Sequence, residues 1–222
     1  MSTAPFVLQL LNSLAALLLL LSFAMLAQRR VVTLVNLLAL QGTILCAATL
    51  LLAWRTGESN LYLSAALTLA LKVLALPWLL HRMIRRLGVY WDTDTLLNIP
   101  GTMLVGVAFV VFSFGLAQPI SAIASTATRS AIGIAVAVIL LAFLTMITRR
   151  KAMSQVVGFL SMENGLFFGA MSATYGMPML VEMGVALDVL VAMLIFGVFL
   201  LQIREQFDSL EIEHAQSIDE EP

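Results

Sequence analysis

The chain has 222 residues, of which 61% are apolar and 11% are charged, and its mean hydropathy is +1.00. A soluble domain is near half apolar and a quarter charged, so this composition excludes an ordinary soluble globular protein. The net charge of −1 and the lack of any long basic block exclude a nucleic-acid binder. One cysteine and two histidines leave almost no ligands for zinc, haem or iron–sulfur clusters. The composition therefore predicts an integral membrane protein without a redox centre of its own.

Seven continuous apolar runs are long enough to cross a bilayer as α-helices, which need about 20 residues each. Continuous runs favour helices over the alternating strands of a barrel. The first run lacks a basic N-terminal region and is followed by Gln28-Arg29-Arg30, so we expect it to be retained rather than removed as a signal peptide. The predicted fold is all-α, with one transmembrane domain (residues 1–203) and the spans Pro5–Ala27, Val31–Ala53, Leu61–Leu80, Pro100–Ala117, Ser130–Ile147, Ala152–Thr174 and Pro178–Ile203.

The basic residues predict the orientation of these spans. Nine of the twelve Lys and Arg residues fall on one side of the predicted membrane. Arg55 and Arg129 fall in loops on the opposite side, and Lys72 lies inside a span. The positive-inside rule places the larger group in the cytoplasm. We therefore expect a bacterial inner-membrane protein with its N-terminus outside and its C-terminus in the cytoplasm. The nine residues of the larger group are Arg29, Arg30, Arg82, Arg85, Arg86, Arg149, Arg150, Lys151 and Arg204.

The C-terminal segment, residues 204–222, is acidic. From Glu205 onwards it contains seven carboxylates and no Lys or Arg. A solvated cytoplasmic tail is the simpler interpretation, and a docking contact with a basic partner is the alternative.

The two ends of the chain resemble each other. Leu37–Gly42 and Ala70–Leu74 in the second and third spans correspond in order to Leu160–Gly165 and Ala186–Leu190 in the sixth and seventh. Each pair of spans follows an apolar helix and a basic turn. This pattern predicts a tandem repeat of three helices (spans 1–3 and 5–7) in the same orientation, joined by span 4.

Four polar residues lie at the predicted middle of the membrane: Gln41, Lys72, Glu163 and Asp188. Each is about 15 Å from the membrane surface at 1.5 Å per residue. An ionised side chain there costs about 2.5–3.5 kcal/mol on insertion scales, so these groups must be paired, neutral or hydrated. One interpretation is a set of ion pairs that fixes helix packing. The other is a proton-handling row, since burial disfavours the charged form of both carboxyl and ammonium groups.

Glu182 lies only four residues into the seventh span, near its outer end. It is interpreted either as a water-exposed carboxylate or as an entry point for protons.

Two packing features accompany the polar positions. Glu163 is expected to project away from a stripe of small residues on the sixth span, so that protein covers both faces of this helix. Pro77, one turn after Lys72, is expected to kink the third span. The stripe consists of Ser154, Gly158, Ser161, Gly165 and Ser172.

Three groups of residues carry a family likeness: Lys72-Val73-Leu74 with Pro77, Gly158 with Met162–Gly165, and Leu180–Gly184 with Asp188. In this order and on these spans, they resemble the component E membrane subunit of hydrogenase-4. That family belongs to the membrane arm of energy-converting hydrogenases and formate hydrogenlyases. The Met-Glu-Asn-Gly stretch, together with the downstream Val181-Glu182 and Asp188, is the most specific part of the resemblance.

Each half of the chain also looks distantly like the three-helix K subunit of respiratory complex I and the C-type subunit of multisubunit sodium/proton antiporters. Those subunits have one glutamate in the second helix and one in the third. The resemblance gives these two places to Glu163 and Asp188 in the second half, whereas Gln41 and Lys72 occupy them in the first half. The first half thus departs from the complex I pattern.

The resemblance implies a non-catalytic subunit of a hydrogenase-4-type complex that contributes to proton translocation coupled to electron transfer. Its partners would be antiporter-like and other membrane subunits, and the [NiFe] and iron–sulfur centres would lie in partner subunits. The alternatives are a subunit of a multisubunit cation/proton antiporter and a structural spacer in a membrane arm. The proton-relay hypothesis names Lys72, Glu163, Asp188, Gln41 and Glu182.

Overall fold

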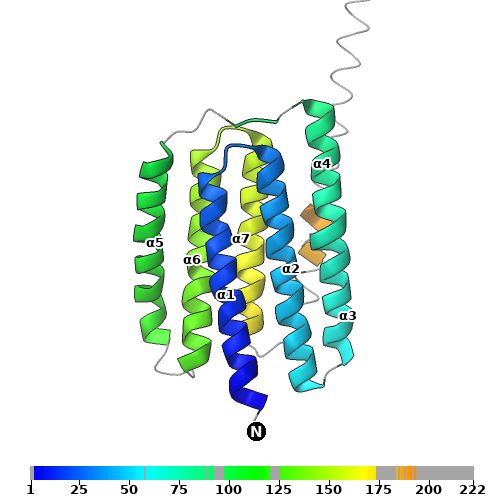
Figure 1. Cartoon of the computed structure of the whole chain (residues 1–222), viewed down its shortest axis with the longest axis vertical. Coiled ribbons are helices and arrows are strands. Elements are labelled where there is room, and N and C mark those ends of the chain that lie inside the picture. Colours follow the sequence, from blue (N-terminus) through cyan, green and yellow to red (C-terminus); the bar gives the residue numbers. More distant parts are fainter. Residues whose placement is uncertain are drawn as a thin grey trace, which may run out of the picture. The chain divides into compact units, whose positions relative to one another are not determined.

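The computed structural model describes residues 3–57, 59–88, 90–92, 98–120, 126–173, 184, 186, 187, 189–191 and 193. The chain divides into two compact units, Met1–Val185 and Ala186–Pro222, and the fold described below belongs to the first. The described part of this unit consists of helices joined by turns, with one isolated β-bridge between Arg30 and Trp91 (Figure 1). Its helices are α1 (Thr3–Ala27), α2 (Val31–Thr56), α3 (Ser59–Thr68), η1 (Leu69–Ala75), α4 (Leu76–Leu87), α5 (Ile99–Ile120), α6 (Thr126–Thr148) and α7 (Ala152–Ala173).

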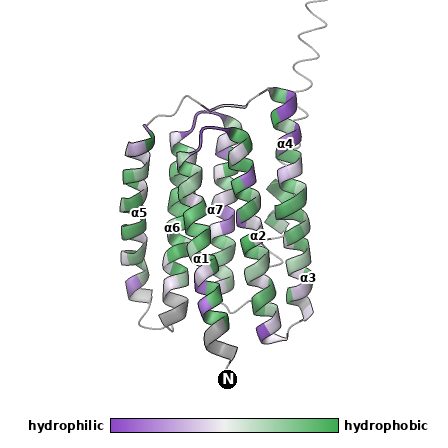
Figure 2. Ribbon diagram, in the orientation of Figure 1, coloured by the Kyte–Doolittle hydropathy of each residue, from purple (hydrophilic) through white to green (hydrophobic). Residues whose placement is uncertain are grey.

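Six helical segments in the described residues are long and apolar enough to cross a membrane. They correspond to the first six predicted spans, and most of their ribbon is hydrophobic in Figure 2. The predicted seventh span, Pro178–Ile203, lies outside the described residues except for isolated helical positions. The six segments are Val7–Ala27, Val31–Thr56, Leu61–Leu87, Ile99–Gln118, Ser130–Thr148 and Ala152–Ala173.

The third span differs from its predicted form in length and in helix type. It continues to Leu87 instead of ending at Leu80, because the helix goes on beyond the apolar run into an arginine-rich turn. Its middle, η1, is a π-helix in which the Leu76 amide donates to the Leu71 carbonyl, five residues back. The proline ring of Pro77 would collide with a carbonyl four residues earlier in a regular α-helix, and a wider turn relieves that collision. A π-helical segment therefore precedes Pro77, where the sequence predicted a kink.

The core lies where four helices meet. Leu18 of α1, Leu45 of α2, Val138 of α6 and Phe168 of α7 are almost completely buried in one cluster. Contacts join α1 to α6 and α2 to α7, so the first two helices of the N-terminal half each touch their counterpart in the predicted repeat. The third helix of the second half is outside the described residues, and the repeat stays a prediction.

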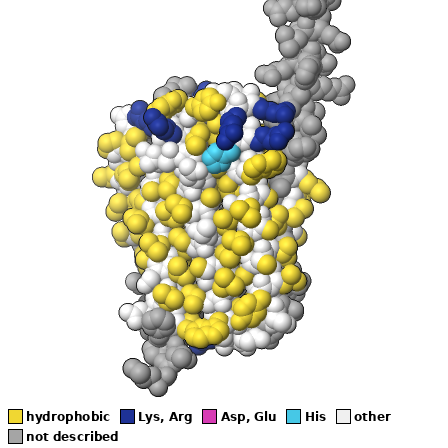
Figure 3. Space-filling model, turned by 45° about the vertical axis from the view of Figure 1, so that its right-hand side comes forward, with side chains coloured by type: hydrophobic (Ala, Val, Ile, Leu, Met, Phe, Trp, Pro, Cys, Tyr) yellow, Lys and Arg dark blue, Asp and Glu magenta, His cyan; other side chains and the backbone are white. Residues whose placement is uncertain are grey.

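The basic turns of this unit meet at one end. Asp92 donates its backbone N–H to the Arg29 carbonyl, and Val31 donates to the Tyr90 carbonyl, so the α1–α2 turn pairs with the segment that follows α4. Arg149 of the α6–α7 turn donates to carbonyls at the end of α1. Figure 3 shows Lys and Arg side chains near this end, above a largely hydrophobic surface.

Candidate functional site

The central feature of the described interior is an ion pair between the third and sixth spans. Lys72 Nζ lies 3.0 Å from Glu163 Oε1, and the side chains are only 4% and 5% exposed. Lys72 belongs to η1 and Glu163 to the middle of α7. Two residues that the sequence placed at the membrane midplane therefore contact each other, which removes the cost of leaving each charge alone in an apolar interior.

A chain of hydrogen bonds continues from Lys72 across three helices. Lys72 Nζ also donates to Asn164 Oδ1 at 3.1 Å, and Asn164 Nδ2 donates to Gln41 Oε1 at 3.4 Å. Gln41 Nε2 then donates to Ser22 Oγ at 3.0 Å, and the Ser22 hydroxyl donates to the Leu18 carbonyl at 3.0 Å. Because a lysine ammonium can only donate, it fixes which way each amide points, and every bond in the chain runs in the same direction.

The backbone of η1 approaches α2 closely beside the ion pair. A Cβ on Gly42 would lie 3.1 Å from both the Cβ and the carbonyl oxygen of Lys72. A residue with a side chain at this position would push against backbone atoms that cannot turn away. Gly42 thus lets the lysine-bearing turn lie directly against α2.

The small-residue stripe of α7 makes the close helix contact that the sequence predicted, and its glycines lie against α6. A Cβ on Gly158 would lie 2.7 Å from Met146 Cγ and 3.3 Å from the Ala142 carbonyl oxygen, and one on Gly165 would lie 3.0 Å from side-chain atoms of α6. Glu163 is directed to η1 instead. The prediction that protein covers both faces of this helix is confirmed, and close α6–α7 packing holds Glu163 in position.

Phe167 forms an apolar wall beside the ion pair. Its ring centroid lies 5.6 Å from Lys72 Nζ, a distance at which an aromatic face attracts a cation. A Cβ on Gly184 would come within 2.7 Å of the same ring, so the backbone at residue 184 lies directly against Phe167. The Phe167 ring is therefore packed against the backbone at residue 184 as well as beside Lys72.

The structure brings together three of the five predicted relay residues: Gln41, Lys72 and Glu163. Glu182 and Asp188 lie outside the described residues, and their roles stay predictions. The sequence reasoning missed Asn164 and Ser22 as members of the network. Asn164 follows Glu163 directly, which was an available signal, whereas one serine in an apolar helix gave none.

A second buried polar group, also missed, lies at the basic end. Arg149 is 3% exposed and its Nη2 donates to the carbonyls of Met25, Leu26 and Gln28 at the end of α1. Burial lowers the pKa of the Arg149 guanidinium, while the charge of Asp92 raises it and that of Arg29 lowers it further. Asp92 is fully buried, and neither of its carboxylate oxygens has a hydrogen-bond partner in the described part of the chain. Arg149 therefore ties α6 to the end of α1, and its charge compensates that of Asp92.

Comparison with known proteins identifies relatives over most of the chain. It is 34% identical over 185 residues to "Uncharacterized protein Rv0085" of Mycobacterium tuberculosis, covering 83% of this chain and 84% of the relative. It is 22% identical over 209 residues to hydrogenase-4 component E of Escherichia coli K12 and of Shigella flexneri, covering 94% of this chain and 97% of each relative. No family model and no solved structure matches. The chain therefore belongs to the family of the mycobacterial protein Rv0085 and is a homologue of hydrogenase-4 component E.

Proposed function

We propose that this chain is a non-catalytic membrane subunit of a hydrogenase-4-type complex, in which the Lys72–Glu163 pair carries protons during translocation coupled to electron transfer. The observation that carries this proposal is the buried pair of a titratable base and a titratable acid, 3.0 Å apart in the middle of two apolar spans. The homology to hydrogenase-4 component E supports the choice of complex.

The pair can hold a proton in two arrangements without moving its heavy atoms. In the first, the Lys72 ammonium donates to the Glu163 carboxylate and to Asn164 Oδ1. In the second, the proton has passed to Glu163, whose hydroxyl donates to the amine lone pair, while an amine N–H still donates to Asn164 Oδ1. The second arrangement has no net charges, which an apolar interior favours, and the first has the stronger attraction. Such a balance lets a nearby charge decide where the proton resides.

The amide part of the network has a different role. Side-chain amides neither gain nor lose protons under physiological conditions, so Asn164 and Gln41 orient the lysine rather than pass its proton onward. Ser22 completes the chain against a backbone carbonyl of α1. This assignment changes the predicted role of Gln41 from proton relay to positioning residue. Protons would then enter and leave the pair through Glu163.

A purely structural spacer is the main alternative. Well-packed apolar residues commonly stabilise a buried interface as well as an ion pair does, so packing alone gives little reason for this pair. The π-helix at Lys72 also favours a functional role over a purely structural one, since π-helical turns are frequent at functional sites. The antiporter alternative shares the proton chemistry and differs only in the partners.

The metal centres of such a complex would belong to other subunits. In the described part of the chain, no group of three or more His, Cys, Asp or Glu side chains lies close enough to hold a metal ion. The one cysteine, Cys46, is buried in α2, where its Sγ lies 3.5 Å from the Ala65 carbonyl oxygen. The proposed place of the [NiFe] and iron–sulfur centres in partner subunits follows from the resemblance to hydrogenase-4 component E.

The proposed orientation puts the basic end of the bundle in the cytoplasm of a bacterium, with the N-terminus outside. The α1–α2 turn, the segment after α4 and the α6–α7 turn meet at that end through backbone hydrogen bonds and through Arg149. The positive-inside rule supports this choice.

The test of complex membership is purification of the tagged full chain from native membranes under mild detergent, followed by identification of the co-purifying subunits. The proposal expects a cysteine-rich hydrogenase subunit with bound nickel and iron among them. Antiporter subunits without any metalloprotein would favour the antiporter alternative, and isolation of the chain by itself as a stable, monodisperse monomer would contradict both.

A further inference from the structure

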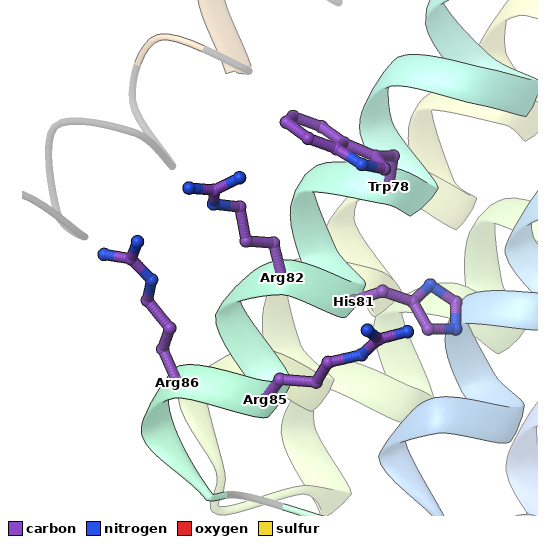
Figure 4. Close-up of a pocket in the computed structure, with 5 residues that line it drawn as sticks. All are labelled: Trp78, His81, Arg82, Arg85 and Arg86. Carbon is purple, nitrogen blue, oxygen red and sulfur yellow. The ribbon is translucent and has the colours of Figure 1, made fainter.

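The arginine-rich end of α4 has a basic hollow that the proton chemistry does not use. Trp78, His81, Arg82, Arg85 and Arg86 line a cavity of about 310 Å³ (Figure 4). One face of the helix carries four of these residues, since Arg82, Arg85 and Arg86 follow Trp78 by four, seven and eight residues. The opposite face, with Pro77, Leu80 and Ile84, is buried against the bundle.

We infer that this hollow binds the phosphate of an anionic phospholipid. The inference goes beyond the proposed function and does not depend on it. Guanidinium groups match phosphate oxygens with paired donors, and basic pockets at the cytoplasmic ends of spans are suited to anionic headgroups.

The residues are arranged along α4 in the order that a lipid molecule requires. Leu74 is 62% exposed and Trp78 is 63% exposed on the membrane-spanning part, where an acyl chain would contact them. Trp78 stands at the boundary, a position that tryptophan favours in membrane proteins, and its ring receives the Arg82 guanidinium 5.5 Å from its centroid. Arg85 is about 10 Å further along the helix than Trp78, at the depth of the headgroups. A free phosphate ion would need the arginines but would gain nothing from the apolar strip beside them.

The His81 ring has a fixed orientation beside the site. Its Nδ1 lies 2.8 Å from the Pro77 carbonyl oxygen, and because a carbonyl only accepts, Nδ1 must be the protonated nitrogen. Figure 4 shows the His81 ring and the Arg85 guanidinium extending toward the same side of the helix. The histidine thus holds a defined ring orientation beside the arginines.

The test uses the fluorescence of Trp78 in the full chain. Trp54→Phe with Trp91→Phe leaves Trp78 as the remaining tryptophan, because the chain has three. The protein is reconstituted into nanodiscs with equal mole fractions of brominated phosphatidylglycerol or brominated phosphatidylcholine, and the quenching by each lipid is compared. We expect the brominated phosphatidylglycerol to quench Trp78 severalfold more strongly at low mole fraction.

Arg82→Gln with Arg85→Gln is the test variant. Each arginine near an anionic surface contributes about fivefold (about 1 kcal/mol) to the attraction of the headgroup, so loss of both should abolish the severalfold preference for phosphatidylglycerol. Arg150→Gln with Lys151→Gln removes the same charge from exposed positions at the α6–α7 turn and should leave the preference nearly unchanged. Arg82→Lys with Arg85→Lys keeps the charge and should retain most of the preference, which separates loss of the site from misfolding.

Three results would overturn the inference: equal quenching by the two lipids, equal losses in the test and control variants, or a loss of preference caused by inorganic phosphate but not by sodium chloride of the same ionic strength. The last result would assign the hollow to free phosphate. A chain in which the seven carboxylates of residues 205–222 are replaced by amides should behave as the unmodified one. A severalfold rise in lipid quenching in that chain would mean that the acidic segment occupies the hollow, which also contradicts the inference.

Discussion

Replacing Lys72 by Met is expected to destabilise the chain because it leaves Glu163 without its ammonium partner. Two unit charges 3.0 Å apart attract each other by about 5 kcal/mol at an effective dielectric constant of about 20. Removing one member of a buried pair costs about 3–5 kcal/mol, because the other charge stays buried. Asn164 also loses its donor, so the amide chain to Gln41 and Ser22 has no fixed direction. The side-chain volume of methionine is close to that of lysine, so the substitution leaves no cavity that would add to the loss of stability.

The assay is thermal unfolding of the full chain in lipid nanodiscs, followed by circular dichroism. For a chain of this size, about 1 kcal/mol shifts Tm by about 2–4 °C, so Lys72→Met should lower Tm by about 6–20 °C. Lys151→Met removes the exposed second lysine of the chain and should change Tm little. Adding Glu163→Gln to Lys72→Met should recover at least half of the loss, because the carboxylate that lost its ammonium partner is then removed as well. A double variant as unstable as the sum of the two single variants would refute the reasoning, since it would show no coupling between the two side chains.

The remaining predictions concern packing, the basic end and orientation. Gly42→Ala should cost about 1–3 kcal/mol by forcing the lysine-bearing turn away from α2, whereas Gly101→Ala, where an added Cβ meets nothing within 4 Å, should be neutral or slightly stabilising in the same melting assay. Arg149→Ala should lower the stability by about 2–4 kcal/mol because charged hydrogen bonds to the end of α1 are lost. Arg150→Ala, at the exposed neighbouring position, should cost almost nothing. Equal losses in the two variants would mean that the α1 contacts contribute no stability. A reporter that is active only in the cytoplasm should be active after Lys151 and inactive in the loop between α2 and α3, and the reverse pattern would invert the proposed orientation.

The spans could be predicted because a bilayer imposes a length and an apolar composition that are visible in the sequence. Their ends could be predicted less well. The third span continues to Leu87 because backbone hydrogen bonding does not stop where hydropathy falls, and arginines with long apolar stems tolerate the membrane boundary. The π-helical turn could not be predicted from Pro77 alone. A proline indicates that one backbone hydrogen bond is missing, but it does not indicate how the neighbouring carbonyls rearrange.

The ion pair could be predicted in outline and not in detail. Charges at the midplane are too costly to leave alone, which made Lys72 and Glu163 expected members of one polar region. Their contact with Asn164 and Ser22 depends on how α1, α2 and α7 are rotated against one another, which the sequence does not state. The burial of Arg149 could not be predicted either, because its position after the fifth span indicated a basic loop at the membrane surface. In the structure its side chain is buried, since the end of α1 offers it backbone carbonyls.

Proton transfer through the Lys72–Glu163 pair is the core of the proposed function in a hydrogenase-type complex. It is tested most directly by the number of protons moved per hydrogen molecule evolved in sealed native vesicles. Glu163→Gln keeps the volume and a hydrogen-bond acceptor for Lys72 but removes the proton-accepting carboxylate. This ratio should fall sharply in the variant while the complex retains its subunits. An unchanged ratio in a fully assembled complex would contradict the account and leave the pair with a structural role.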